Sequence, residues 1–196
     1  MENNKMELYK QQIQQTGRIP AELLPKTKNE ALSVLATWPK QYYKTLHPAT
    51  YNDVFKSLTP SIATFRKENG QNGLLATQAL LTVIVRDIVR SFNVGQTMDE
   101  EQVADLINDI IDQYYWLNIE DFRLCFNNAK AGRYDRNGIF RLDASVVLSW
   151  LDKYTSERLH AADDTSFDEH QSNKFSENLP DFEKYYNQAK KKWKQS

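Results

Sequence analysis

Apolar side chains recur along most of the chain at the spacing of an amphipathic α-helix. The most regular run has apolar residues at i, i+3, i+4, i+7, i+8 and i+11, namely Val103, Leu106, Ile107, Ile110, Ile111 and Tyr114. Residues 74 to 92 are apolar on nearly every side, which predicts a central buried helix. The alternation of apolar and polar residues that marks a strand is nearly absent. The hydrophobic pattern therefore predicts an all-α fold.

Capping signals divide this pattern into separate helices. A first helix is expected near residues 2 to 15, ending at Gly17. The other predicted N-terminal caps are Thr27 with Glu30, Thr50 with Asp53, Thr59 followed by Pro60, Thr97 with Glu100, Asn118, and Asp143. The caps and apolar stripes together predict a single-domain bundle of about seven or eight helices.

Residues 133 to 142, "RYDRNGIFRL", interrupt the helical pattern. Asn137 and Gly138 form the pair preferred in a tight turn whose two central residues have positive φ. The residues on either side are compatible with strands, so a short β-hairpin is expected here. Gly132 is expected to end the preceding helix.

The composition changes after residue 160. We expect a helical domain over residues 1 to 160, followed by an acidic polar linker over residues 161 to 180, "AADDTSFDEHQSNKFSENLP". Residues 181 to 196 are basic and aromatic and are expected to form a C-terminal helix or arm.

The overall charge gives no reason to expect the whole surface to bind polyanions. The chain has 196 residues, with 25 basic against 26 acidic side chains, so attraction to nucleic acid or an anionic membrane must come from a local patch. The single cysteine, Cys125, excludes an internal disulfide framework, fits a reducing compartment and lies on an apolar helix face. No secretory signal is expected, and the apolar run over residues 74 to 85 is shorter than the roughly 20 residues that a bilayer requires.

Basic side chains surround the predicted turn. Lys130, Arg133, Arg136 and Arg141 either belong to a purely structural turn or also position phosphate groups of a nucleic acid. The segment also resembles part of a calcium loop, but Arg133 stands at the first ligand position and Ala144 replaces the bidentate glutamate. We therefore expect no metal here.

The C-terminal segment is a second candidate. Four cations stand on either side of one ring here: Lys190, Lys191, Lys192, Trp193 and Lys194. Such a mixture suits single-stranded nucleic acid, because bases stack on the ring and phosphates pair with the cations. The alternatives are a surface helix with solvated lysines and a contact with a partner protein.

Catalytic chemistry has little support in the sequence. His47, His160 and His170 are not spaced for a shared metal, and no phosphate-binding loop, dinucleotide turn or nucleophile elbow is present. We expect a protein that is not an enzyme and has no cofactor. Protein contact is a further possibility, because Tyr114 is expected to point inward and Tyr115 cannot share its face.

The stretches "DFRLCFNNAKAGRY" and "RLDASVVLSWLDKY" are the most distinctive parts of residues 92 to 158, about a third of the chain. This segment resembles an uncharacterised family of phage and mobile-element proteins of gut Bacteroidota. Asp135 and Ala144 stand where that family usually has glycine. The layout is also distantly similar to phage proteins that load or inhibit replicative helicases.

The family has no assigned activity, so the leading hypothesis is a non-enzymatic phage or mobile-element accessory protein that acts by binding, in DNA replication beside a helicase or on single-stranded DNA. Its partner would be a replication protein or single-stranded DNA, in the cytoplasm of a bacterial host. The alternative is a structural or assembly protein of a virion, whose partners would be neighbouring subunits. An oligomer is compatible with either reading, and no membrane partner is expected.

Overall fold

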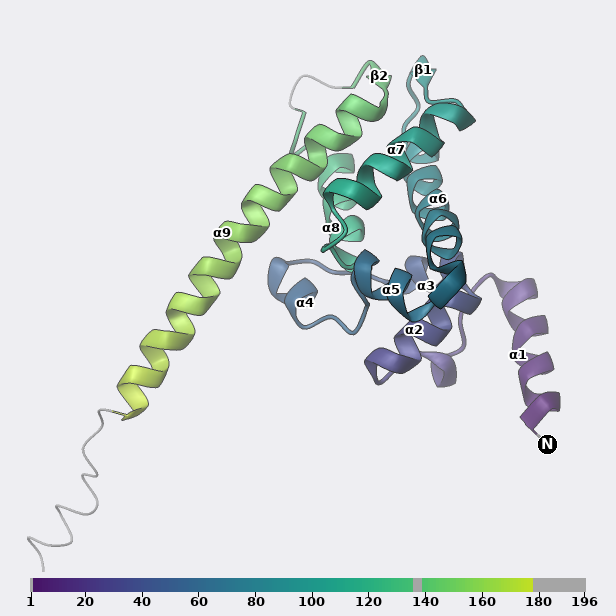
Figure 1. The fold of residues 1–196 in the computed structure, drawn as a ribbon, viewed down its shortest axis with the longest axis horizontal. Helices are drawn as coiled ribbons and strands as arrows, with labels where there is room; N and C mark the ends of the chain where they lie inside the picture. Colours follow the sequence, from purple (N-terminus) through teal and green to yellow (C-terminus); the bar gives the residue numbers. More distant parts are fainter. Residues whose placement is uncertain (1, 136–138, 178–196) are drawn as a thin grey trace, which may run out of the picture. The chain divides into compact units, whose positions relative to one another are not determined.

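A computed structural model describes residues 2 to 135 and 139 to 177, with side chains described over 7 to 135 and 139 to 166. The described elements are α1 (Glu2–Thr16), η1 (Ala21–Leu23), α2 (Lys28–Thr37), α3 (Pro39–Thr45), α4 (Tyr51–Phe55), α5 (Ile62–Glu68), η2 (Gly70–Asn72), α6 (Gly73–Ser91), β1 (Gln96–Thr97), α7 (Glu100–Gln113), α8 (Ile119–Lys130), β2 (Arg141–Leu142) and α9 (Ala144–Glu177). The predicted all-α fold with a small β element is confirmed (Figure 1).

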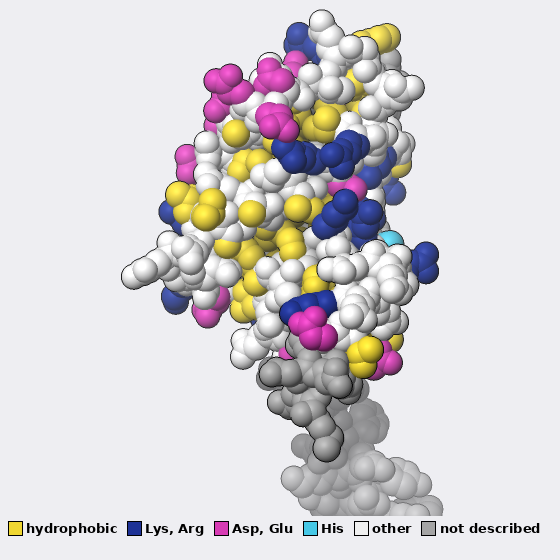
Figure 2. Space-filling model, turned by 90° about the vertical axis from the view of Figure 1, so that its right-hand side faces the viewer, with side chains coloured by type: hydrophobic (Ala, Val, Ile, Leu, Met, Phe, Trp, Pro, Cys, Tyr) yellow, Lys and Arg dark blue, Asp and Glu magenta, His cyan; other side chains and the backbone are white. Residues whose placement is uncertain are grey.

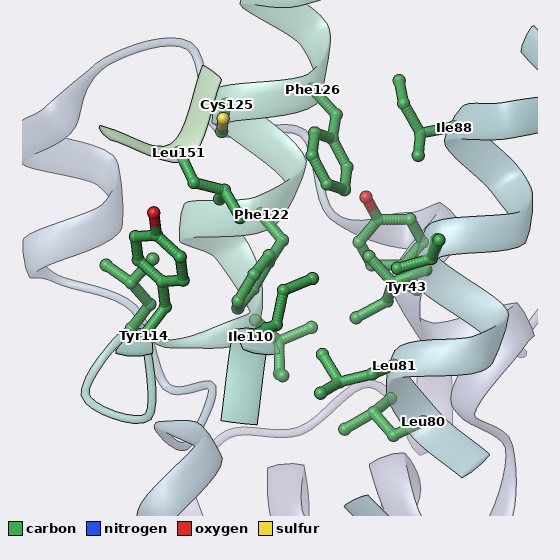
Figure 3. Close-up of a cluster of buried hydrophobic side chains, with 14 of the residues drawn as sticks. Tyr43, Leu80, Leu81, Ile88, Ile110, Tyr114, Phe122, Cys125, Phe126 and Leu151 are labelled. Carbon is green, nitrogen blue, oxygen red and sulfur yellow. The ribbon is translucent and has the colours of Figure 1, made fainter. Parts of the chain in front are cut away.

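The chain divides into two compact units, Met1–Thr155 and Ser156–Ser196, and α9 contributes residues to both. In the first unit, the core is built around α6, which packs against α3, α5, α7 and α8. Figure 3 shows part of this core, with Leu80, Leu81 and Ile88 of α6 facing aromatic rings such as Tyr43 and Phe126. The apolar faces that the sequence predicted are therefore brought together in one cluster.

Helix α6 is more one-sided than its sequence suggested. One face is buried, but Leu74 and Leu75 near its start are exposed. The stretch Gly70–Ser91 is long and apolar enough, by length and composition alone, to cross a membrane. The sequence analysis compared only the shorter apolar run, residues 74 to 85, with the thickness of a bilayer. In the structure, α6 contributes its buried face to the core of the first unit.

Helices α7, α8 and α9 supply the other side of the core. The predicted stripe on α7 is buried, and Tyr114 at its end is buried while Tyr115 is exposed, as expected. Trp150 and Tyr154 of α9 are fully buried. The Tyr154 hydroxyl donates a hydrogen bond to Asp121 Oδ1 of α8 at 2.6 Å, which satisfies a buried carboxylate within the core.

Most of the predicted helix ends are confirmed, and two N-terminal caps lie elsewhere. Thr27, Thr50, Asn118 and Asp143 cap their helices, with complete capping boxes at Thr50–Asp53 and at Asn118–Asp121. Helix α5 is capped by Ser61, because Thr59 is buried and hydrogen-bonded to Ser57. Helix α7 is capped by Asp99 with Gln102, because Thr97 belongs to β1. Both predictions missed a stronger capping residue two positions further on.

The β element is not the predicted hairpin. Strand β2 pairs in parallel with β1, with Gln96 opposite Arg141 and Thr97 opposite Leu142. A local turn signal suggested an antiparallel partner just before Asn137, but residues 133 to 135 form no strand in the structure. The turn residues 136 to 138 lie outside the described residues. The non-local pairing joins the segment after α6 to the segment before α9.

The predicted linker begins as helix. Residues 161 to 177 continue α9 without a break, in place of the loop that we expected. The segment is polar and acidic, but it contains no glycine or proline before Pro180 and begins with two alanines. Residues 178 to 180 and the predicted arm at 181 to 196 lie outside the described residues.

Candidate functional site

A basic groove lies between α3 and α6. Its cavity of about 430 Å³ is lined by Lys40, Tyr43, Lys44, Thr82, Val83, Arg86, Asp87 and Arg90. Two cations come from each helix, and both pairs are spaced by four residues, so each pair lies on one side of its helix about 6 Å apart along the axis. The four basic side chains are exposed. Figure 2 shows Lys and Arg side chains gathered across the middle of one face of the molecule.

Arg123 of α8 contacts lining residues of the groove on both α3 and α6. Its guanidinium donates a hydrogen bond to the Leu46 carbonyl at 3.1 Å, lies 3.5 Å from Asp87 Oδ2, and stacks over the Tyr43 ring at 5.1 Å from the centroid. Leu46 directly follows α3, so one side chain connects α3, α6 and α8. Burial raises the pKa of Tyr43, which keeps its ring neutral beside the guanidinium.

The groove keeps a surplus of positive charge. Asp87 is the one carboxylate among the lining residues, and it is already engaged by Arg123. Arg86 forms an exposed ion pair with Glu100 at 2.7 Å, which contributes little and exchanges readily with solvent. Across the described part of the chain, no acidic side chain lies within ion-pair distance of Lys40, Lys44 or Arg90. The groove is therefore suited to an anion with several charges.

The structure separates the basic residues that the sequence grouped around the turn. Partial burial lowers the pKa of Lys130, which is close enough to Asp87 and Arg123 for their charges to act on it but does not line the groove. Arg133 is exposed. Arg141 pairs with Asp143 at 3.0 Å beside a polar crevice at β1 and β2. Of the described turn residues, only Lys130 is near the groove.

Several predicted binding residues fall outside the described residues. They are Arg136 of the turn and Lys190, Lys191, Lys192, Trp193 and Lys194 of the C-terminal segment. Their roles remain predictions.

The sequence analysis did not single out the groove cations. A signal was present, because Lys40 with Lys44 and Arg86 with Arg90 are like charges at i and i+4. Such pairs repel each other slightly on a helix, but the acidic pairs Glu101/Asp105 and Asp105/Asp109 have the same spacing, so the signal is not specific. What the sequence could not supply was the packing of α3 on α6, which places the two pairs across one cavity.

A second, more apolar groove lies between α5 and α7. Its cavity of about 510 Å³ is lined by Ile62, Ala63, Arg66, Lys67, Ile111, Asp112 and Tyr115. Tyr115 is 53% exposed, and its carbonyl accepts a hydrogen bond from the Ala63 amide at 2.8 Å, which fixes the backbone at this edge. Tyr115 is the ring that the sequence analysis expected to be available for contact with a partner protein or a neighbouring element.

The structure also places the cysteine and two of the three histidines that the sequence offered as candidate functional residues. Cys125 is buried in the core among apolar side chains, as its helix face predicted. Within residues 2 to 135 and 139 to 177, no group of three or more His, Cys, Asp and Glu side chains is arranged to hold a metal ion. His47 and His160 are both exposed.

Comparisons with protein-family models, with curated proteins and with solved structures found no match for this chain.

Proposed function

We propose that this protein is a non-enzymatic accessory protein that binds nucleic acid through the basic groove between α3 and α6. The observation that carries the proposal is the set of four cations, Lys40, Lys44, Arg86 and Arg90, around one carboxylate held by Arg123. Phosphate contacts from lysine and arginine provide most of the affinity of such proteins.

The form of the groove favours a chain of phosphates over a single small anion. Its cations are exposed and stand in two rows, each about 6 Å long, instead of converging on one buried point. A polyanion can satisfy both rows at once, whereas a small phosphate ester would leave part of the charge unused. A setting in DNA replication is part of this proposal, and it comes from the distant likeness in layout to phage proteins that load or inhibit replicative helicases.

The experiment is fluorescence anisotropy of a labelled 20-nucleotide DNA titrated with the full chain at several salt concentrations. If the ligand neutralises the four groove cations, the log–log salt slope for a single strand should be about −3. The variant Lys44→Gln with Arg90→Gln should bind more weakly and should have a slope smaller in magnitude by about 1.4, because two phosphate contacts are lost.

A matched control is available in the second groove. Arg66→Gln with Lys67→Gln removes one arginine and one lysine from an exposed site on α5, so the net charge changes equally. This control should retain the wild-type slope. Absence of binding at low salt, or equal losses in both double variants, would overturn the assignment of the groove.

The predicted C-terminal arm can be tested in the same assay. Replacing Lys190, Lys191, Lys192 and Lys194 by glutamine in the full chain should weaken binding further if the arm contributes phosphate contacts. An unchanged affinity would remove the arm from the proposed interface and leave the groove.

A second function is favoured by one observation, the half-exposed Tyr115 over the groove between α5 and α7. Tyrosine rings in such positions anchor protein interfaces. In that case the protein would act in virion assembly, as a subunit in contact with its neighbours. Light scattering would then show an oligomer or a stable complex that persists at high salt and is lost in Tyr115→Ala.

A further inference from the structure

The segment between α8 and α9 is held by the domain on both sides of residues 136 to 138. On the first side, Tyr134 is buried, its carbonyl accepts a hydrogen bond from Lys153 Nζ at 2.8 Å, and Asp135 accepts one from Trp150 Nε1. On the second side, Arg141 pairs with Gln96 of β1. Residues on each side of this gap are thus in contact with the rest of the domain, and a residue next to such contacts can present its side chain in a defined position.

Phe140 is the side chain that this segment presents. Its ring is 84% exposed, more than any other large hydrophobic side chain in the described part of the chain. The residue before it, Ile139, packs against the core, and the residue after it, Arg141, lies in β2. Phe140 therefore lies between a residue that packs against the core and a residue of β2, and its side chain is exposed to solvent beside Arg141.

The ring is within reach of the groove along one continuous path. Arg90 lines the groove near the end of α6, and six peptide units separate it from Gln96, a span of at most about 22 Å. Gln96 pairs with Arg141, about 5 Å away across the strands, and Figure 1 shows β1 and β2 side by side. The two spans add to at most about 27 Å, which a 20-nucleotide single strand can cover.

We infer that Phe140 stacks on a nucleobase, and that the ligand of the basic groove is therefore single-stranded. This inference rests on the proposed function. A single strand offers the face of every base to an aromatic ring, whereas a duplex keeps these faces inside its own stack. The groove would hold the phosphates and Phe140 would hold a base at the other end of the path.

The test compares Phe140→Ala with wild type on three probes: a 20-nucleotide thymine oligomer, its counterpart with abasic positions throughout, and a 20-base-pair duplex. Phe140→Ala should bind the thymine oligomer about tenfold more weakly, because one base–ring stack is lost. Its affinity for the abasic oligomer and for the duplex should equal that of wild type. Phe140→Trp should bind the thymine oligomer at least as well as wild type.

The controls separate this inference from the proposed function. Tyr115→Ala removes another exposed ring, in the groove between α5 and α7, and should leave affinity for the thymine oligomer unchanged. If Phe140→Ala binds like wild type while the Lys44→Gln, Arg90→Gln variant is weakened, the stacking role is overturned and the groove remains. Equal losses on the thymine and abasic oligomers would also overturn stacking, since no base is then involved. If wild type binds none of the probes, the proposed function fails as well.

Discussion

The close approach of α5 to α6 makes Gly73 the described glycine at which an added methyl group meets the closest contacts. A Cβ on Gly73 would lie 2.0 Å from the Arg66 carbonyl oxygen and 2.9 Å from its carbon, both backbone atoms of α5. Ordinary contacts begin at 3.4 Å, so the two helices would have to separate by more than an ångström. Side chains can turn away from such a clash, but a helix backbone cannot.

The magnitude follows from two opposing effects of Gly73→Ala. Alanine favours the helix by at most about 1 kcal/mol, whereas overpacking of a close contact typically costs about 1–3 kcal/mol. With backbone on one side of the clash, we expect the upper part of that range, and a net fall of about 2 kcal/mol in the free energy of unfolding. Urea unfolding followed by far-ultraviolet circular dichroism measures this quantity.

Gly95→Ala is the matched control, because a Cβ at Gly95 meets nothing within 4 Å and the residue has no positive φ. That variant should remain within about 0.5 kcal/mol of wild type. If Gly73→Ala were as stable as wild type or as Gly95→Ala, the two helices would not be as close as the structure places them, and the reasoning would be refuted.

Two further predictions concern buried and capping carboxylates. Tyr154→Phe removes the hydroxyl that donates to Asp121 but keeps the ring, so the free energy of unfolding should fall by about 1–3 kcal/mol in urea titrations; no change would mean that this bond is not formed. Hydrogen bonds from the Ala49 and Thr50 amides hold the pKa of Asp53 below its usual range, so this carboxylate stabilises the protein above its ordinary pKa and stops doing so as pH falls through the lowered one. Melting temperatures of wild type and Asp53→Asn should therefore differ at about pH 6 and converge towards about pH 2, and a constant difference would contradict this account.

Features that depend on neighbouring residues could be predicted from the sequence. The apolar stripe of α7 follows from a period of 3.6 residues, and its members are buried. The capping box at Thr50 and Asp53 depends on four consecutive residues, and it is present. Tyr114 is buried and Tyr115 is exposed as expected, although α7 ends at Gln113 and Tyr115 lies in the turn that follows. In each case the deciding interaction lies within a few residues of its own position.

Features that depend on distant residues could not be predicted in the same way. The Asn-Gly pair signals a hairpin locally, but the partner of β2 is β1, which precedes it by 45 residues. The groove needs α3 to pack on α6, and no periodicity within either helix specifies that contact. The polar composition of residues 161 to 177 does not distinguish a loop from an exposed helix, so the continuation of α9 could not be predicted from it.

The bond between Tyr154 and Asp121 also bears on the order in which the protein folds during synthesis. Asp121 lies in the first turn of α8, and the tyrosine that donates to it is made 33 residues later. A nascent chain that ends before α9 lacks Trp150, Leu151 and Tyr154 and leaves the core open around a carboxylate that is buried in the finished domain. The side of the core that α9 covers, around Asp121 and Phe92, is therefore completed last, only after residue 154 has left the ribosome.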